Sequence, residues 1–229
     1  FNISRKQEMI QGFFSRKVNR RIAEIVVDDN LVEAYMSNGI DLPFLKSGAV
    51  CFLREVDNNN RRTSYDLFSV YDKDTLVCVD SKEPLIIAEM WCREKYNHDG
   101  DSLAYLYPDV KYMKLHGRTK TNKDVIIQVM GTSLKHDRLA YLPEIPSRSL
   151  IEKLENLIYQ KRIGMDTRLM IVVCRDDVDG FFANDEVDSD FAELMEFAFD
   201  SEIPIDILRC SVSDNGMRAD RIISNMNGI

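Results

Sequence analysis

The sequence predicts two domains, a small all-β barrel followed by an α/β domain with a mixed sheet. The chain has 229 residues, which is enough for two domains of ordinary size. Short apolar and β-branched runs separated by turn residues fill the first 80 residues, and from about residue 105 strands alternate with helices. We therefore place the barrel at 1–80 and the α/β domain at 81–229, with a bridging helix region at 81–104.

Turn residues between apolar and β-branched runs indicate the barrel strands. Residues 22–27 and 31–36 flank the turn sequence Asp28-Asp29-Asn30, which predicts a β-hairpin. Three further runs have the same composition, at 49–53, 65–71 and 75–79. Closing these strands into a barrel removes exposed sheet edges.

The second half of the chain alternates between strand and helix patterns. A helix is predicted at 84–95, because proline fits the first helical turn. Ser149 and Glu152 form a capping-box pattern at the start of a second helix, which we expect to end near Gly164. A third helix is indicated by an apolar stripe of Phe191, Leu194, Met195 and Ala198. Strands are predicted at 124–130, 169–174 and 205–208. This order implies parallel strands joined by right-handed crossovers.

The charge pattern limits the classes of partner. The net charge of -8 and the isoelectric point near 5.0 argue against a simple basic nucleic-acid-binding protein. The acidic excess lies after residue 135, however, and the preceding part is close to neutral. The acidic residues at 176–190 are expected to form a solvated loop whose charge favours the start of the following helix.

Cysteine, histidine and apolar runs indicate a cytoplasmic protein. Five widely spaced cysteines without a C-x-x-C pair are typical of reduced thiols. The histidines at 98, 116 and 136 lack the spacing of a zinc site. The longest apolar run, 169–174, is too short to span a membrane, and the N-terminal residues lack the apolar core of a signal peptide. We expect no membrane partner and no cofactor.

Several short motifs follow one another along the chain. They are 16–26, Ser37-Asn38-Gly39, 47–50, 58–62, 110–112, 132–134, 140–143 and 182–208. In their order and spacing these motifs resemble the sugar fermentation stimulation protein A family over nearly the whole chain. The resemblance implies an N-terminal OB-fold-like β-barrel and a C-terminal restriction-endonuclease-like α/β domain.

The resemblance also implies a metal site, from which this sequence departs. The family's site has an Asp on one strand and Glu-x-Lys on the next, where the carboxylates hold a divalent cation and the lysine helps the attacking water. The Glu and Lys positions are occupied here by Gln128 and Met130, and residues 113–120 contain no carboxylate. A neutral amide oxygen is a weaker ligand for a hard cation, and methionine carries no charge. We therefore predict a degenerate site without catalytic residues.

Two groups of cations are candidates for nucleic-acid binding, because Lys and Arg pair with phosphates. The first group is Arg16, Lys17, Arg20, Arg21, Arg61 and Arg62, with Phe13, Phe14 or Tyr65 as stacking residues. The second group is Lys111, Lys114, Arg118 and Lys120, with Lys123 beside them. Ordinary solvated hairpins are the alternative explanation for both groups.

These observations predict a DNA- or RNA-binding protein with a regulatory or accessory role and without nuclease activity. Its affinity should be modest and should fall with salt. One alternative is a metal-dependent nuclease in which Glu89, Asp109 or Asp124 rebuilds a Mg²⁺ site. Another is a protein-interaction module that uses the acidic C-terminal half. The sequence leaves open DNA versus RNA, single versus double strand and the oligomeric state, and it is compatible with a homodimer.

Overall fold

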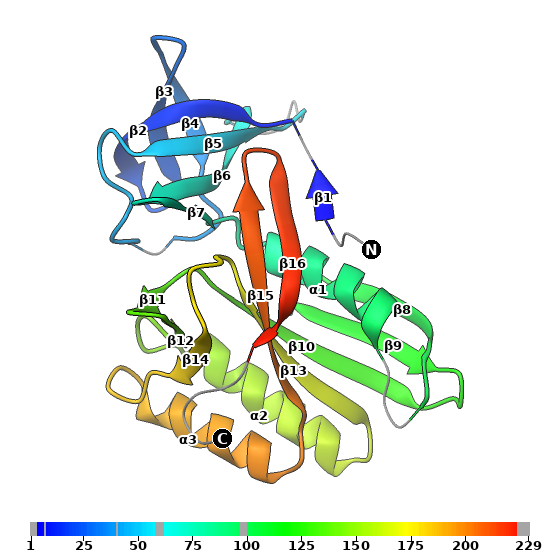
Figure 1. Ribbon diagram of the computed structural model, residues 1–229. Helices are drawn as coiled ribbons and strands as arrows, with labels where there is room; N and C mark the ends of the chain where they lie inside the picture. The colour runs from blue at the N-terminus through cyan, green and yellow to red at the C-terminus, as the bar shows by residue number, and fades with distance from the viewer. Residues whose placement is uncertain (1–3, 7, 40, 58–61, 97–99, 224–229) are drawn as a thin grey trace.

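The computed structural model describes residues 4–6, 8–39, 41–57, 62–96 and 100–223 (Figure 1). Its N-terminal half is a closed barrel with the OB architecture, and its C-terminal half is a curled mixed sheet with helices on both faces. The predicted two-domain fold class is thereby confirmed. In the part of the chain that the structure describes, every helix is too short or too polar to cross a membrane.

Six strands contribute to the barrel sheet. They are β2 (Ile10–Asn19), β3 (Ile22–Val27), β4 (Asn30–Tyr35), β5 (Val50–Glu55), β6 (Tyr65–Asp72) and β7 (Thr75–Cys78). Their order is β4-β3-β2-β5-β6-β7, and pairing of Ala34 with Tyr65 joins β4 to β6 and closes the barrel. In the predicted hairpin, Asp28 and Asp29 have φ values of 46° and 62°, as a two-residue turn of type I′ requires.

A seven-stranded sheet is the centre of the C-terminal domain. Its strands, in spatial order, are β1 (Ser4–Lys6), β16 (Gly216–Ile223), β15 (Ile205–Ser213), β13 (Asp166–Val173), β10 (Asp124–Thr132), β9 (Lys114–Thr119) and β8 (Leu103–Asp109). The central strands β10, β13 and β15 run parallel and the outer ones antiparallel, which makes the sheet mixed as predicted. A small second sheet contains β11 (Lys135–His136), β12 (Leu139–Leu142) and β14 (Gly180–Ala183).

Each face of this sheet packs against different helices, which are α1 (Glu83–Lys95), α2 (Arg148–Arg162) and α3 (Ser189–Asp200). Ile127 of β10 belongs to a core cluster with Leu85 of α1, whereas its neighbour Ile126 belongs to a cluster with Leu154 of α2. Side chains of successive strand residues point to opposite faces, which explains the division. Helix α2 lies along β10 and β13, and β8 is the sheet edge beyond β9 (Figure 1).

The N-cap of helix α2 lies two residues before the predicted one. Its N-cap is Ser147, whose backbone is extended and whose Oγ accepts a hydrogen bond from Leu150 N at 3.4 Å. Glu152 accepts from Arg148 Nε at 3.1 Å, and Ser149 lies inside the first turn. The capping-box assignment is therefore wrong. Both serines precede the apolar stripe, and the sequence pattern alone does not distinguish them.

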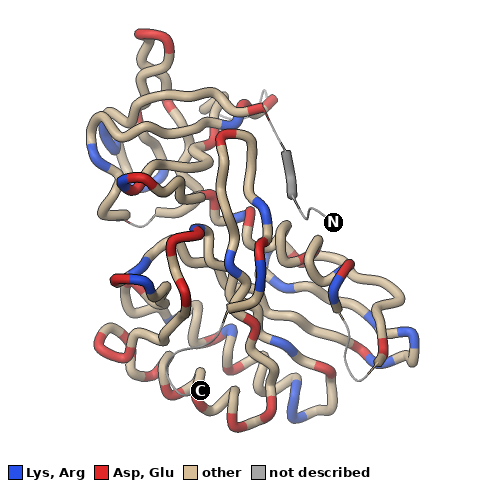
Figure 2. The backbone as a smooth tube through the Cα atoms, in the orientation of Figure 1, with Lys and Arg blue, Asp and Glu red and all other residues tan. Residues whose placement is uncertain are grey.

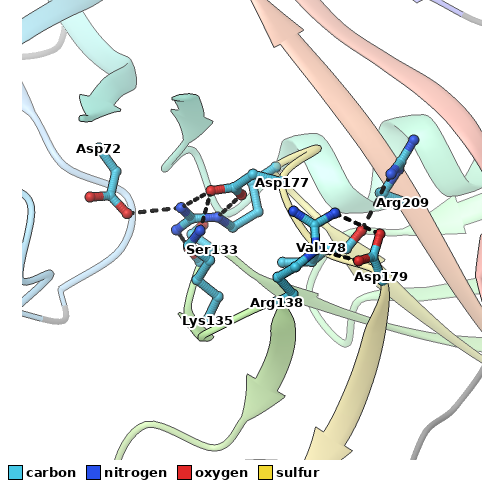
Figure 3. A network of polar contacts seen from close by, with 9 residues as sticks. Asp72, Ser133, Lys135, Arg138, Asp177, Val178, Asp179 and Arg209 are labelled. Atoms are coloured by element: carbon cyan, nitrogen blue, oxygen red, sulfur yellow. Dashed lines mark hydrogen bonds and ion pairs between the residues drawn. The ribbon is translucent and has the colours of Figure 1, made fainter. Parts of the chain in front are cut away.

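One polar cluster connects the barrel to the C-terminal domain through Arg175 (Figure 3). The Arg175 side chain is only 1% exposed; its Nη2 donates to Asp72 Oδ2 of the barrel at 2.8 Å, and its Nε donates to Asp177 Oδ1 at 2.6 Å. Its Nη1 donates to the carbonyl of Ser133 at 3.0 Å, and Lys135 also pairs with Asp177. A buried guanidinium is thereby satisfied by both domains.

Acidic residues around this cluster have specific partners. Burial opposes the ionisation of Asp177, but hydrogen bonds from Arg175 and Lys135 outweigh it and hold the pKa of Asp177 well below its usual range. The expectation of a solvated acidic loop is therefore wrong for Asp177. Asp188 does favour a helix start, since its Oδ1 accepts from Phe191 N at 3.1 Å as the N-cap of α3. Figure 2 shows the acidic residues gathered along α3 and its preceding loop, whereas the barrel carries both signs.

A second polar cluster fixes the segment between the barrel and α1. Arg54 of β5 donates to Glu83 Oε1 at 2.7 Å and also pairs with Asp80, and both carboxylates are buried. Ser37 Oγ donates to Asp80 Oδ1 at 3.0 Å and accepts from Ser81 N at 2.7 Å. The turn that begins at Ser37 therefore holds this connecting segment in place.

Candidate nucleic-acid interface

Gln128 occupies the first of the two strand positions where the resemblance implies charged residues. The side chain is fully buried, and its Nε2 lies 3.2, 3.0 and 3.3 Å from the backbone carbonyl oxygens of Tyr112, Met113 and Val129. Its Oε1 is buried without a hydrogen-bond partner among the described residues. The surrounding carbonyls favour a donor at this position, which an amide supplies and a carboxylate does not.

Met130 occupies the second position and lines a cavity of about 350 Å³ between the two domains. The barrel contributes Arg20, Asn38 and Leu42 to its wall, and the C-terminal domain contributes, among others, Pro84, Met113, Met130, Leu134, Leu142, Pro143, Glu144, Ser149 and Lys153. The volume is in the range of small-molecule sites. Apolar side chains supply much of this wall, so a charged lysine at 130 would lie among apolar groups.

Two ionisable residues of the cavity have shifted pKa values. Burial and the nearby Asp41 raise the pKa of Glu144 to about 7, while Lys17 opposes this rise. Burial and the charge of Lys114 lower the pKa of Lys153. The shift of Glu144 reduces its negative charge near neutral pH.

The residues present do not fit a divalent cation at the Gln128 position. Glu89 lies on α1, on the other side of the sheet, where it pairs with Arg93. Asp109 of β8 lies opposite Lys114 in the strand register, and Asp124 of β10 lies opposite Arg118. The two carboxylates therefore flank opposite ends of β9. Within the described ranges, no three His, Cys, Asp or Glu side chains are grouped as metal ligands. A hard cation needs several oxygen ligands, which this site does not offer.

Most of the first cation group is paired with acidic residues or a backbone carbonyl of the barrel and the segment that follows β4. Arg16 pairs with Glu24 at 2.7 Å, Lys17 with Asp41 and Arg62 with Glu33 at 3.0 Å, while Arg21 donates to the carbonyl of Ser37. Arg20 is separate from these pairs and lines the cavity. Arg61 lies outside the described residues.

The aromatic residues expected beside this group are not equivalent. Phe13 is 47% exposed, but Phe14 is only 4% exposed and belongs to the barrel core, and Tyr65 is partly buried against the same core. The expectation that Phe14 offers a stacking surface is wrong, because alternation along β2 turns its ring inward.

The second cation group is divided between the two ends of β9, with Lys111 and Lys114 near one end and Arg118, Lys120 and Lys123 near the other. Arg118 Nη2 pairs with Asp124 at 2.6 Å, Lys114 bonds to Asn156 of α2, and the ammonium of Lys111 lies 4.9 Å from the ring centroid of Tyr112. Lys120 and Lys123 are exposed next to the turn between β9 and β10. The structure therefore places the group on the edge of the sheet formed by β8, β9 and β10, in two subgroups at opposite ends of β9.

Three aromatic residues that the sequence analysis did not single out lie within the second group. In the register of β8 against β9, Tyr105 lies opposite Arg118 and Tyr107 lies opposite His116. Tyr107 is stacked on both sides, with ring centroids 6.3 Å from Tyr105 and 5.6 Å from His116. We call Tyr105, Tyr107 and His116 the aromatic strip. The alternation of Tyr105 and Tyr107 about Leu106 was the signal that could have identified it.

Comparison with known proteins places both halves of the chain. The SfsA N-terminal OB domain model matches residues 16–79, and the sugar fermentation stimulation protein RE domain model matches residues 104–216. A sugar fermentation stimulation protein homolog of Thermosipho melanesiensis is 27% identical over 216 residues, which cover 93% of each chain. The homolog of Ruminiclostridium cellulolyticum is 24% identical over 206 residues, which cover 89% of this chain and 91% of the relative.

A solved structure shares the fold of the whole chain. The structure of Pyrococcus furiosus SfsA in complex with Ca²⁺ is similar with a TM-score of 0.82 and 16% sequence identity. The match covers 95% of this chain and 96% of that chain. Both domains therefore have counterparts in one known protein.

Proposed function

Because the chain belongs to the sugar fermentation stimulation protein family, we propose that it binds nucleic acid in an accessory or regulatory role and does not cleave it. The observation that carries the proposal is the pair of uncharged residues, Gln128 and Met130, at the Glu-x-Lys positions. Metal-dependent hydrolysis needs fixed negative charge around the cation and a group to assist the attacking water. Neither residue supplies these.

The second cation group supports binding without cleavage. Lysines and arginines can hold a phosphate backbone by charge alone, and such contacts carry no requirement for a metal ion. The Pyrococcus furiosus relative was solved in complex with Ca²⁺. For the present chain we propose no equivalent cation, because Gln128 directs its amide nitrogen at backbone carbonyls.

The proposal is tested with labelled single- and double-stranded oligonucleotides at about 50 mM and about 200 mM salt, with and without Mg²⁺. We expect binding at the lower salt, much weaker binding at the higher salt and intact oligonucleotide throughout. Cleavage that depends on Mg²⁺ would show an active nuclease with a rebuilt site. Absence of binding at low salt would leave the protein-interaction alternative.

A charge reversal locates the surface. Lys120→Glu should weaken binding and reduce the slope of log K against log salt by about 0.7–0.9, the contribution of one phosphate contact. Arg221→Glu is the matched control, since it reverses an exposed charge on β16, near the opposite edge of the sheet. Equal effects of the two variants would argue against a surface at β8, β9 and β10.

A further inference from the structure

The aromatic strip is exposed at the edge of the C-terminal sheet. Tyr105 and Tyr107 are 50% and 54% exposed, and neither belongs to a core cluster of the described residues. Natural edge strands are generally protected by charged residues, whereas β8 presents two tyrosines on one face. Packing among the described residues does not account for these rings.

The strip lies on the sheet face that α2 covers only in part. Cross-strand partners share a face, so Tyr107 and His116 lie on the same side of the sheet as Ile126, which packs in the cluster of α2. Lys114 reaches Asn156 of α2 from this face, which places the helix edge next to the strip. The open remainder of the face is a shallow surface bounded by α2.

The geometry of the rings suits planar groups. The Tyr105 and Tyr107 rings are within 20° of parallel, as are those of Tyr107 and His116. Bases can therefore stack on the exposed faces of these rings, with a contribution that depends little on sequence.

The charges around the strip favour an anionic occupant. Lys114 and Arg118 lie on its face of β9, and Lys111, Lys120 and Lys123 belong to the turns at the two ends of β9. The carboxylates of the same face are Asp109, 3.9 Å from His116, and Asp124, which pairs with Arg118. Over residues 101–124 these five cations outnumber the three carboxylates, which are Asp101, Asp109 and Asp124. Rings next to positive charges are what a single strand needs for its bases and phosphates.

The strip is also continuous with the cavity. Met113, which precedes Lys114, lines the cavity wall, as does Lys153, one helical turn from Asn156. A strand laid along the rings would therefore lead towards Met130. This course connects the exposed surface with the degenerate positions.

We infer that the aromatic strip binds the unpaired bases of single-stranded nucleic acid, which makes the protein selective for single strands over duplexes. In a duplex the bases stack on one another, so their faces are not available to protein rings. The inference rests on the proposed function and adds to it the class of substrate and the residues that recognise it.

The test compares the wild type with the Tyr105→Leu/Tyr107→Leu double variant in anisotropy titrations against oligothymidylate, oligouridylate and a duplex at low salt. We expect the double variant to lose at least about tenfold in affinity for the single strands and to bind the duplex as the wild type does. Tyr105→Phe/Tyr107→Phe keeps the rings and should bind like the wild type. The DNA and RNA arms show which single strand is preferred.

Phe199→Leu is the matched control, because Phe199 on α3 is 49% exposed and lies outside the strip. Leucine keeps apolar bulk in each variant, and unchanged thermal unfolding will show that the sheet edge is intact. Single strands bound equally by the wild type and the double Leu variant, or duplex bound as tightly as single strands, would overturn the inference while the proposed function stands. Absence of binding to every oligonucleotide would overturn both.

Discussion

At the scale of single residues, Gln128 shows which kind of side chain the middle of β10 accommodates. Its position and that of Met130 lie on one face of β10, as the alternation of a strand requires. The backbone carbonyls of Tyr112 and Met113 accept hydrogen bonds from its amide nitrogen. The surroundings of this position therefore suit an uncharged hydrogen-bond donor.

Restoring the family residue should consequently destabilise the protein. Gln128→Glu replaces the donor by acceptors in a fully buried position, and we expect a loss of about 2–3 kcal/mol in the free energy of unfolding. Burial raises the pKa of such a carboxyl, so the folded state retains the proton and the loss should grow as the pH rises from about 5 to 8. Chemical denaturation at both pH values measures this.

Gln128→Met is the control for that experiment. It removes the polar atoms, including the buried Oε1, and introduces no acceptor, so its cost should be smaller and independent of pH. A Gln128→Glu variant as stable as the wild type at pH 8 would contradict the role assigned to the carbonyls.

At the scale of elements, the start of α2 shows how one hydrogen bond selects between two candidate caps. Ser147 has the extended backbone of an N-cap and accepts from Leu150 N, whereas Ser149 is already helical. The backbone N–H of Ser147 donates to Asp188 Oδ2 at 2.9 Å, and Asp188 in turn caps α3. The starts of both helices are thereby held together beside the cavity.

The two serines should differ in their contribution to stability. Ser147→Ala removes the cap acceptor and should lower the free energy of unfolding by about 1 kcal/mol. Ser149→Ala, the matched control, should leave it unchanged within about 0.5 kcal/mol, because alanine is a good helix former at an exposed position. Thermal unfolding followed by circular dichroism distinguishes them, and an equal cost for both changes would contradict the assigned cap.

At the scale of the whole molecule, Arg175 is a buried polar connection between the two domains. It lies at the end of β13, yet it bonds to Asp72 of the barrel, 103 positions away, and to Asp177. A buried guanidinium without these partners would be unfavourable, and so would the carboxylates without it. The orientation of the barrel over the cavity therefore depends on this side chain.

Removing the guanidinium should destabilise the assembly of the two domains. Arg175→Met leaves Asp177 with Lys135 alone, and we expect a loss of about 3–5 kcal/mol at pH 7 in denaturant unfolding. The depressed pKa of Asp177 means that its stabilisation is full above the ordinary aspartate pKa of about 4 and is lost as the pH falls further. The difference between variant and wild type should therefore shrink below about pH 4.

Two comparisons check this assignment. Arg175→Lys keeps the charge but reaches fewer acceptors than the guanidinium, so its stability should lie between those of Arg175→Met and the wild type. A variant Arg175→Met that unfolds at the wild-type denaturant concentration would show that the network does not hold the domains together.

Local patterns in the sequence determined most of the elements. The hairpin around Asp28 follows from turn chemistry, and the central strands and helices follow from residue composition and periodicity. The uncharged pair Gln128 and Met130 was also evident, because strand alternation places the two on one face whatever surrounds them. The strand at 216–223 was not predicted, since its alternation is interrupted by charged residues.

The tertiary structure decided which face of each element is buried, which is exposed and which residues it contacts. The sequence shows that Tyr105 and Tyr107 share a face, but only the packing shows that α2 stops short of them and leaves their rings exposed. Likewise, composition alone predicts a solvated loop for the acidic residues at 176–190. The structure instead pairs Asp177 with the buried Arg175, which also bonds to Asp72 of the barrel. Periodicity is a property of neighbours along the chain, whereas exposure, pairing and the cavity at Met130 depend on residues that folding brings together from both domains.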